Sequence, residues 1–192
     1  MAKIDLVESL QVTIDTVQDA LDKGAEKAAF FCALSIPDIC AQIEYSNSKL
    51  KNMDTGERYS KWYNKNLYYS ENPPGQFPMN QLDGDVAYLI RCKLYHEGEP
   101  LHKKAIEKME ENYKLLISED QLLISGEINV NVEFVSENCE RFSMKYDVDR
   151  DNHPTGTIVI NVYVNRVMLA QKLLWIANGV IENFKKNNPT SD

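Results

Sequence analysis

The chain is organised around residues 83–98, which read DGDVAYLIRCKLYHEG. Asp83 belongs to the residue types that cap helix N-termini, and Asp85 places a second carboxylate in the first turn, where the helix dipole favours negative charge. Gly98 is a typical C-terminal helix stop. Between these ends, apolar residues recur at helical spacing and form one stripe: Val86, Leu89, Ile90 and Leu94. The segment therefore predicts an amphipathic helix with both ends marked.

The same helix carries a strong cation and a titratable imidazole near its C-terminal end. Arg91 presents a planar fork of donors that matches a phosphate, and His96 is the side-chain type whose proton exchanges near neutral pH. In an ideal helix their Cα directions differ by about 140°, with an offset of about 7.5 Å along the axis. A joint site therefore requires either a loosened helix end at His96 or complementary groups from two subunits.

The sequence before this helix predicts three further helices. Residues 7–21 carry apolar side chains at three- and four-residue spacings, a stripe that either packs within the monomer or pairs with a second subunit. Residues 25–43 predict a second helix, bent at Pro37 because the proline ring removes a helical amide. Residues 56–67 predict a third helix. The prolines and glycine of residues 71–78 then predict a surface loop.

After the central helix, a charged helix is predicted over residues 101–116, and the apolar period then changes. Alternating apolar and polar residues predict three strands, over residues 128–134, 142–148 and 157–164. The turn-rich residues 149–156 favour an antiparallel meander, and a closing helix follows Asn165. The predicted fold is mainly α: a helical bundle forming a single domain over residues 1–192, with a small antiparallel β-meander inserted at 119–164 before the C-terminal helix.

Composition narrows the possible functions. The 192 residues, 43% of them hydrophobic, suit one globular domain. No apolar run approaches the roughly 20 residues that a transmembrane helix needs, and no signal-peptide pattern occurs, so we expect a cytoplasmic protein without a membrane partner. The net charge of −8 argues against general nucleic-acid binding, so any RNA contact must be local. No Cys-x-x-Cys pair occurs, which predicts reduced structural thiols at Cys32, Cys40, Cys92 and Cys139.

One local candidate for RNA binding is the basic and aromatic segment of residues 49–65. Its five Lys or Arg side chains outnumber two carboxylates and alternate with Tyr and Trp, a pattern that holds single-stranded RNA by phosphate contacts and stacking. The alternative is an amphipathic helix whose aromatic side chains face the core. His102 and His153 lack the paired spacing of a zinc site, and no glycine-rich phosphate loop occurs. We therefore expect no metal and no cofactor.

The spacing of Arg91, four residues and His96 near a helix end resembles the HEPN superfamily, whose members often act as ribonucleases. The resemblance extends to residues 30–40, 59–63 and 83–92, roughly the first half of the chain, which is similar to bacterial HEPN-like proteins of unassigned activity. It implies a metal-independent endoribonuclease in which the RNA 2′-hydroxyl attacks the adjacent phosphodiester. Arg91 would then stabilise the charge that develops on the phosphate, and His96 would transfer protons.

The resemblance further implies a homodimer and an RNA substrate, and it offers Asp38 and Glu44 as possible orienting acids. A toxin or phage-defence role, with an antitoxin or other protein partner, follows by family analogy alone. The alternative is a noncatalytic dimeric HEPN-like binding or scaffold module, in which Arg91 pairs with a carboxylate and His96 caps a helix. Cys92 stands where active members commonly carry Asn, Asp or His. Ordinary solvated helix charges are the commoner interpretation of Asp38 and Glu44.

Overall fold

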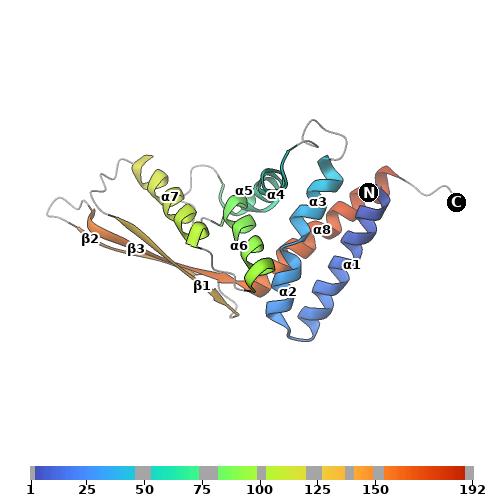
Figure 1. The fold of residues 1–192 in the computed structure, drawn as a ribbon, viewed down its shortest axis with the longest axis horizontal. Coiled ribbons are helices and arrows are strands. Elements are labelled where there is room, and N and C mark those ends of the chain that lie inside the picture. The colour runs from blue at the N-terminus through green and yellow to red at the C-terminus, as the bar shows by residue number, and fades with distance from the viewer. Residues whose placement is uncertain are drawn as a thin grey trace. The chain divides into compact units, whose positions relative to one another are not determined.

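A computed structural model of the chain describes residues 3–45, 53–73, 82–98, 103–119, 127–136, 141–148 and 154–188. The described chain is mainly helical, with a small three-stranded sheet before the final helix, as the sequence predicts. Its elements (Figure 1) are α1 (Lys3–Asp22), α2 (Glu26–Ala33), α3 (Ile36–Tyr45), α4 (Thr55–Tyr63), a π-helix (Asn64–Tyr68), α5 (Tyr69–Glu71), α6 (Gly84–Glu97), α7 (Lys103–Glu119), β1 (Ile128–Val135), β2 (Arg141–Val148), β3 (Pro154–Asn165) and α8 (Arg166–Asn187).

The chain forms two compact units. The first unit combines Met1–Leu67 with Arg166–Asp192, and the second unit is Tyr68–Asn165. The sheet belongs to the second unit together with α6 and α7, so this unit begins well before residue 119, where the predicted β-rich insertion starts. The second unit is therefore an α/β assembly that includes α6, the helix that carries Arg91 and His96.

The first unit is a helical bundle that α8 closes. This helix packs against α1, α2 and α3, and α4 packs against α3. Leu10 and Val17 of α1 and Leu173 and Ala177 of α8 have no exposed surface, so the apolar stripe predicted for residues 7–21 faces the inside of its own bundle. The last helix of the chain therefore completes the core of the first helices, which are more than 100 residues away in sequence.

The predicted bend at Pro37 is a complete break between two helices. α2 ends at Ala33 and α3 begins at Ile36, so Pro37 lies in the first turn of α3. A proline is well placed there because a first-turn amide has no helical acceptor. The hydroxyl of Ser35 donates to the carbonyl oxygen of Cys32 at 2.7 Å and satisfies a carbonyl at the end of α2. Because Pro37 has no amide proton, the helix is interrupted ahead of it, between Ala33 and Ile36. The sequence predicts a bend within one continuous helix instead.

The helix predicted over residues 56–67 changes its winding along its length. Asp54 caps α4 by accepting a hydrogen bond from the amide of Glu57 at 3.0 Å, but regular α-helix ends at Tyr63 and a π-helix follows. The wider π turn adds a residue per turn and is frequent at functional sites. The side-chain amide of Asn66 in the π-helix donates to the carbonyl oxygen of Trp62 in α4 at 2.9 Å.

The sheet is mixed, so the predicted antiparallel meander is wrong. The strand order is β1–β3–β2: β1 pairs with β3 in parallel, and β2 pairs with β3 antiparallel. β3, the longest strand, takes the central place, and its Ile158, Ile160, Val162 and Val164 are all at most 4% exposed. Alternation identifies a strand but not its neighbours, and β1 and β2 end up on opposite sides of β3.

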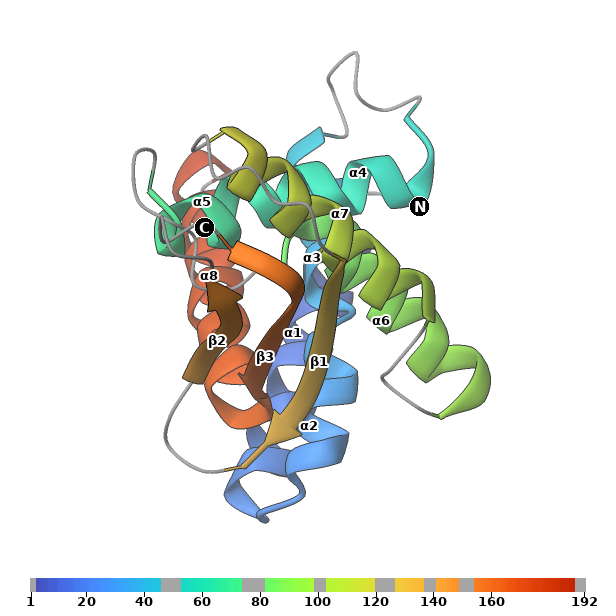
Figure 2. The same ribbon diagram turned by 90° about the vertical axis from the view of Figure 1, so that its left-hand side faces the viewer.

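The two faces of the sheet differ in character. One face is apolar, and α7 packs along β1 (Figures 1 and 2). Met109 and Tyr113 of α7 are buried. The carboxylate of Glu110 on α7 also accepts the outward amide of Val130 on this edge strand, at 3.2 Å. On the other face a polar ladder crosses all three strands: Asn131 donates to Asn161 at 3.0 Å, and Asn161 donates to Ser143 at 3.2 Å.

Both predicted caps of the central helix are confirmed. The carboxylate of Asp83 accepts the amide of Val86 at 2.9 Å and the side-chain amide of Asn112 on α7 at 2.7 Å. Gly98 has φ of 73°, and its amide donates to the carbonyl oxygen of Leu94 at 3.0 Å. Asp83 therefore both starts α6 and ties it to α7.

We expect Asp83→Ala to lower the unfolding free energy by about 1–2 kcal/mol, since it removes the cap and the bond to α7. Asp83→Asn keeps a capping oxygen and should retain most of the stability. Burial raises the pKa of the Asp83 carboxyl, although hydrogen bonds from Val86 and Asn112 oppose this effect. Because the folded protein holds this proton more tightly than the unfolded chain, ionisation of Asp83 lowers stability as pH rises above about 4.

Urea unfolding at pH 4 and pH 7 tests this prediction. The wild type should lose more stability than Asp83→Asn between these two values, because the amide does not ionise. Equal losses in both proteins would contradict the assigned role of the buried carboxyl.

Candidate functional site

Arg91 is held between two tyrosine rings of its own helix. Its guanidinium carbon lies 5.0 Å from the centroid of the Tyr95 ring and 5.9 Å from that of Tyr88. These residues are four positions after and three positions before Arg91, the spacings that place side chains on one side of a helix. Arg91 is half-buried and Tyr95 is 44% exposed. The cation–π contacts therefore hold the guanidinium, whose Nε is buried, against the exposed Tyr95 ring.

His96 is exposed, and the helix around it stays regular. α6 continues to Glu97, and the left-handed Gly98 ends it without any loosening at His96. Lys93 and Glu97 form an ion pair on this last turn. The loosened end that would bring His96 toward Arg91 in one chain is thus absent from α6.

Arg91 and His96 lie at the two margins of one helical face. On a regular helix, Tyr95, Tyr88 and Cys92 fall between them, and the whole arc spans about 140°. Each of these three side chains retains some exposure. The opposite side of α6 is buried through Val86, Ala87, Ile90 and Leu94. A single chain therefore carries an exposed His96 and a half-buried Arg91 on this face but does not aim them at one point.

The two acids suggested by the resemblance have partners in the first unit. Asp38 accepts from the side-chain amide of Gln42 at 3.4 Å and lies 3.8 Å from the guanidinium of Arg58. Glu44 accepts the indole N–H of Trp62 at 3.0 Å and pairs with Lys65 at 3.3 Å. Arg91 and His96 belong to the second unit. The observed contacts thus give both acids a structural role within the first bundle.

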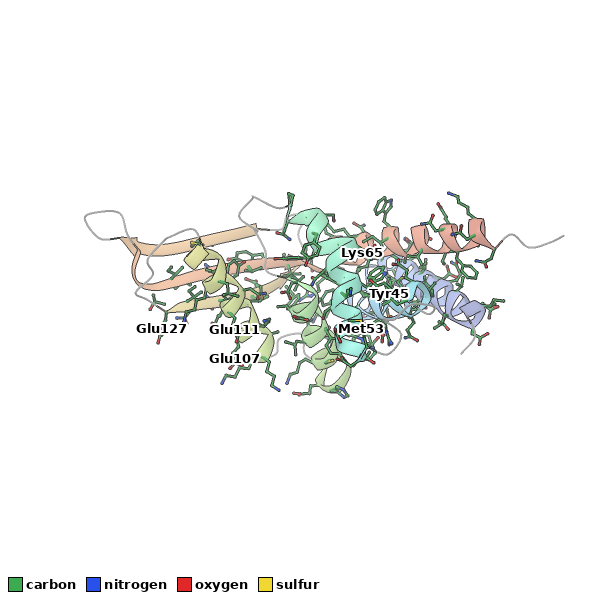
Figure 3. The ribbon with its side chains drawn as sticks, turned by 90° about the horizontal axis from the view of Figure 1, so that it is seen from above. Tyr45, Met53, Lys65, Glu107, Glu111 and Glu127 are labelled. Atoms are coloured by element: carbon green, nitrogen blue, oxygen red, sulfur yellow. The ribbon has the colours of Figure 1, made fainter. Side chains whose placement is uncertain are left out.

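A polar hollow of about 410 Å³ adjoins Glu44 in the first unit, within the size range of small-molecule sites. Figure 3 labels Lys65, which contributes to its wall from the π-helix. The other lining side chains come from α3, the π-helix and the end of α8: Ile43, Glu44, Asn66, Val180, Asn183, Phe184, Asn187 and Asn188. Sequence reasoning missed this hollow because its carboxamides come from segments over 100 residues apart, and no local motif joins them.

A second hollow, of about 510 Å³, runs between α7 and β1 in the second unit. Figure 3 labels Glu107, Glu111 and Glu127 beside it. Four carboxylates and one ammonium line it, together with two strand residues: Glu107, Glu110, Glu111, Lys114, Glu127, Ile128 and Asn129. Within the described ranges, no group of three or more His, Cys, Asp or Glu side chains is arranged to hold a metal ion. The negative charge of this second hollow disfavours binding of a nucleic-acid phosphate backbone.

The aromatic residues of the basic segment face the core of the first unit. Tyr59 and Trp62 have no exposed surface and Tyr63 has 2%. Residues 49–52 lie outside the described residues. Since buried rings offer no stacking platform, the observed part of this segment fits the amphipathic-helix alternative.

Two of the described cysteines, Cys32 and Cys40, have thiols that are poorly suited to catalysis. Burial raises the pKa of the Cys40 thiol strongly, with Glu44 adding to the effect, and burial also raises that of Cys32. Both thiols are therefore poor nucleophiles.

Cys139, His102 and His153 lie outside the described residues. In the part of the chain that the structure covers, no helix is long and apolar enough to cross a membrane.

Glu44 should stabilise the folded state, because Trp62 is fully buried and its indole N–H donates to this carboxylate. We expect Glu44→Ala to lower the unfolding free energy by about 1–3 kcal/mol, the usual effect of an unsatisfied buried donor. Glu44→Gln keeps an acceptor and should lose far less. Lys65→Ala is the matched control, since its exposed ion pair contributes at most about 1 kcal/mol. Chemical unfolding measures all three, and an Ala variant as stable as Lys65→Ala would remove the structural role.

Neither unit by itself contains a complete catalytic constellation among the described residues. The arrangement that comes nearest to a catalytic constellation is the partly exposed arc of α6. The guanidinium of Arg91 lies at one margin of this arc, and the imidazole of His96 lies at the other. Comparison with protein-family models, with curated proteins and with solved structures finds no match for this chain. The function must therefore be inferred from the arc itself.

Proposed function

We propose that the chain is a HEPN-like, metal-independent endoribonuclease in which two copies combine Arg91 and His96 at a shared cleft. The observation that carries this proposal is the placement of both side chains at the margins of one partly exposed face of α6. Because one regular helix cannot aim them at one phosphate, a second α6 must supply the complementary group. Two copies related by a two-fold axis provide two equivalent Arg–His pairs.

The chemistry follows from the two side chains. The RNA 2′-hydroxyl loses a proton and attacks the adjacent phosphorus, and the P–O5′ bond breaks to leave a 2′,3′-cyclic phosphate and a 5′-hydroxyl. Neutral His96 accepts the proton of the 2′-hydroxyl, and the protonated imidazole donates a proton to the leaving O5′, while Arg91 stabilises the charge on the phosphoryl oxygens. The tyrosine contacts support this role for Arg91, since they orient its donors before substrate binds. A cytoplasmic toxin or phage-defence role, with an antitoxin as partner, is part of the proposal by family analogy only.

The second candidate is a noncatalytic dimeric binding or scaffold module. The acidic hollow between α7 and β1 favours it, because four carboxylates and a net charge of −8 suit a basic protein partner better than RNA. In that case the stacking of Arg91 on Tyr88 and Tyr95 only stabilises the surface of α6. Asp38 and Glu44 then act only as structural charges of the first unit.

Cleavage of RNA by purified variants separates the two candidates. With EDTA present, wild type should leave cyclic-phosphate ends, while Arg91→Ala and His96→Ala should each lower the rate by about 100-fold or more. Lys145→Ala, which removes an exposed cation from β2, and His102→Ala are the controls and should keep wild-type rates. DNA of the same sequence should stay intact because it lacks the nucleophile.

A mixture of the two inactive variants tests the shared cleft. Each mixed dimer contains one intact Arg91 facing one intact His96, so random mixing should restore about one quarter of the wild-type activity. Unchanged cleavage in the single variants would remove the assignment of Arg91 and His96. Absence of any cleavage by wild type would leave the binding module as the better candidate.

A further inference from the structure

Trp175, on α8, is the most exposed large apolar residue in the described part of the chain. Its surface is 80% exposed, whereas the other tryptophan, Trp62, has none. The inward side of α8 is fully used, since Leu173, Leu174 and Ala177 are buried in the first unit. The indole therefore stands on the outer face of a helix whose inner face already has its partners. Exposed tryptophans are characteristic of interface centres.

The residues around Trp175 form a seam along the outer face of α8. They follow each other at alternating spacings of four and three: Met168, Lys172, Trp175, Gly179, Glu182 and Lys186. This heptad spacing keeps a stripe facing a partner helix in a left-handed pair. All six residues have at least intermediate exposure. Gly179 adds a hollow beside the indole, because a Cβ placed there would meet no atom within 4 Å.

The seam is complementary to itself. When two identical helices pair antiparallel with the two-fold axis level with Ala177, each residue meets the one equally far on the other side of 177. In this register Trp175 meets Gly179 of the partner helix, so a large ring enters a place without a side chain. Lys172 meets Glu182 in the next layer, which joins opposite charges. Both pairs occur twice because the contact is symmetric.

We infer that a second copy of this chain docks antiparallel on the outer face of α8, with the Trp175 ring over Gly179 of the partner and Lys172 beside its Glu182. A partner of unrelated sequence would need no such symmetry. The size match of Trp175 with Gly179 and the charge match of Lys172 with Glu182 fall in one register, which is what an isologous contact requires. The comparable stripe of α1 is buried inside the bundle and is not available for pairing.

The contact is limited in area, so it is reversible. The seam from Met168 to Lys186 is about 27 Å long, which gives one helix pair and an interface below the size of a typical stable complex. We expect a dissociation constant in the micromolar range, centred on the two Trp175 rings. The inference rests on the first unit alone and does not depend on RNA cleavage.

Charge exchange tests the register directly. Sedimentation of wild type from about 1 to 200 µM should show reversible self-association that depends on the α8 seam, in addition to any pairing of α6 that RNA cleavage requires. Lys172→Glu and Glu182→Lys each create two like-charge layers and should raise the dissociation constant by about tenfold or more. An equimolar mixture of these two variants should pair, because opposite charges then meet in both layers. The double variant, which carries both substitutions in one chain, should pair with itself for the same reason. Lys185→Glu, which reverses a charge on α8 outside the seam, is the control and should dimerise like wild type.

Gly179→Leu separates docking from folding. Leu favours a helix more than Gly does, and open space surrounds this position, so the variant should fold at least as well as wild type. It should nevertheless raise the dissociation constant by about 30-fold or more, because the partner ring loses its hollow. Tryptophan emission offers a second readout. It should move to shorter wavelength when wild type dimerises, because the Trp175 ring then leaves water. Trp62 is buried in monomer and dimer alike, so it should not contribute to the shift. Wild type that remains monomeric at 200 µM, or charge variants that dimerise normally, would overturn the inference.

Discussion

Packing of α8 against α1, α2 and α3 is the interaction on which the first unit depends. The buried side chains of α1 and α8 meet although most of the chain separates them, and neither helix covers its apolar stripe without the other. Burial of each such aliphatic side chain contributes about 1.5–3 kcal/mol, whereas isolated helices of this kind are marginal in water. On the outer face of the same helix, Trp175 remains exposed.

The second unit depends on a different arrangement, in which α7 lies between α6 and the sheet edge. Side chains of α7 form hydrogen bonds with both neighbours. Asn112 donates to Asp83, the N-cap of α6, and Glu110 accepts a hydrogen bond from the backbone amide of Val130 on β1. An edge strand whose amide is satisfied by a carboxylate is less open to pairing with other strands. The helix that carries the proposed chemistry is therefore anchored at its start, while its exposed arc near Arg91 and His96 is left for contact.

The two proposals place contacts between copies on different elements. RNA cleavage needs a second α6 near the arc of Arg91 and His96, and the antiparallel pair needs a second α8 at Trp175. The observations behind them are independent: one concerns the orientation of a guanidinium by two rings, and the other concerns a symmetric match of size and charge. Glu44 and Asp38 have a simpler role, since their observed partners stabilise the bundle in which they lie.

The sequence by itself determined the features that depend on neighbours within a turn or a strand. Both caps of α6, the helical spacing of the α1 stripe and the alternation in the three strands are local signals, and the structure agrees with them. Only the tertiary structure decided that β3 lies between β1 and β2, that Pro37 separates two helices, and that Glu44 serves Trp62. These outcomes depend on which surfaces become buried together, and residues far apart in the chain compete for that burial. The spacing of Arg91 and His96 was likewise visible in the sequence, but the regular end of α6, which keeps them apart in one copy, was decided by the folded helix.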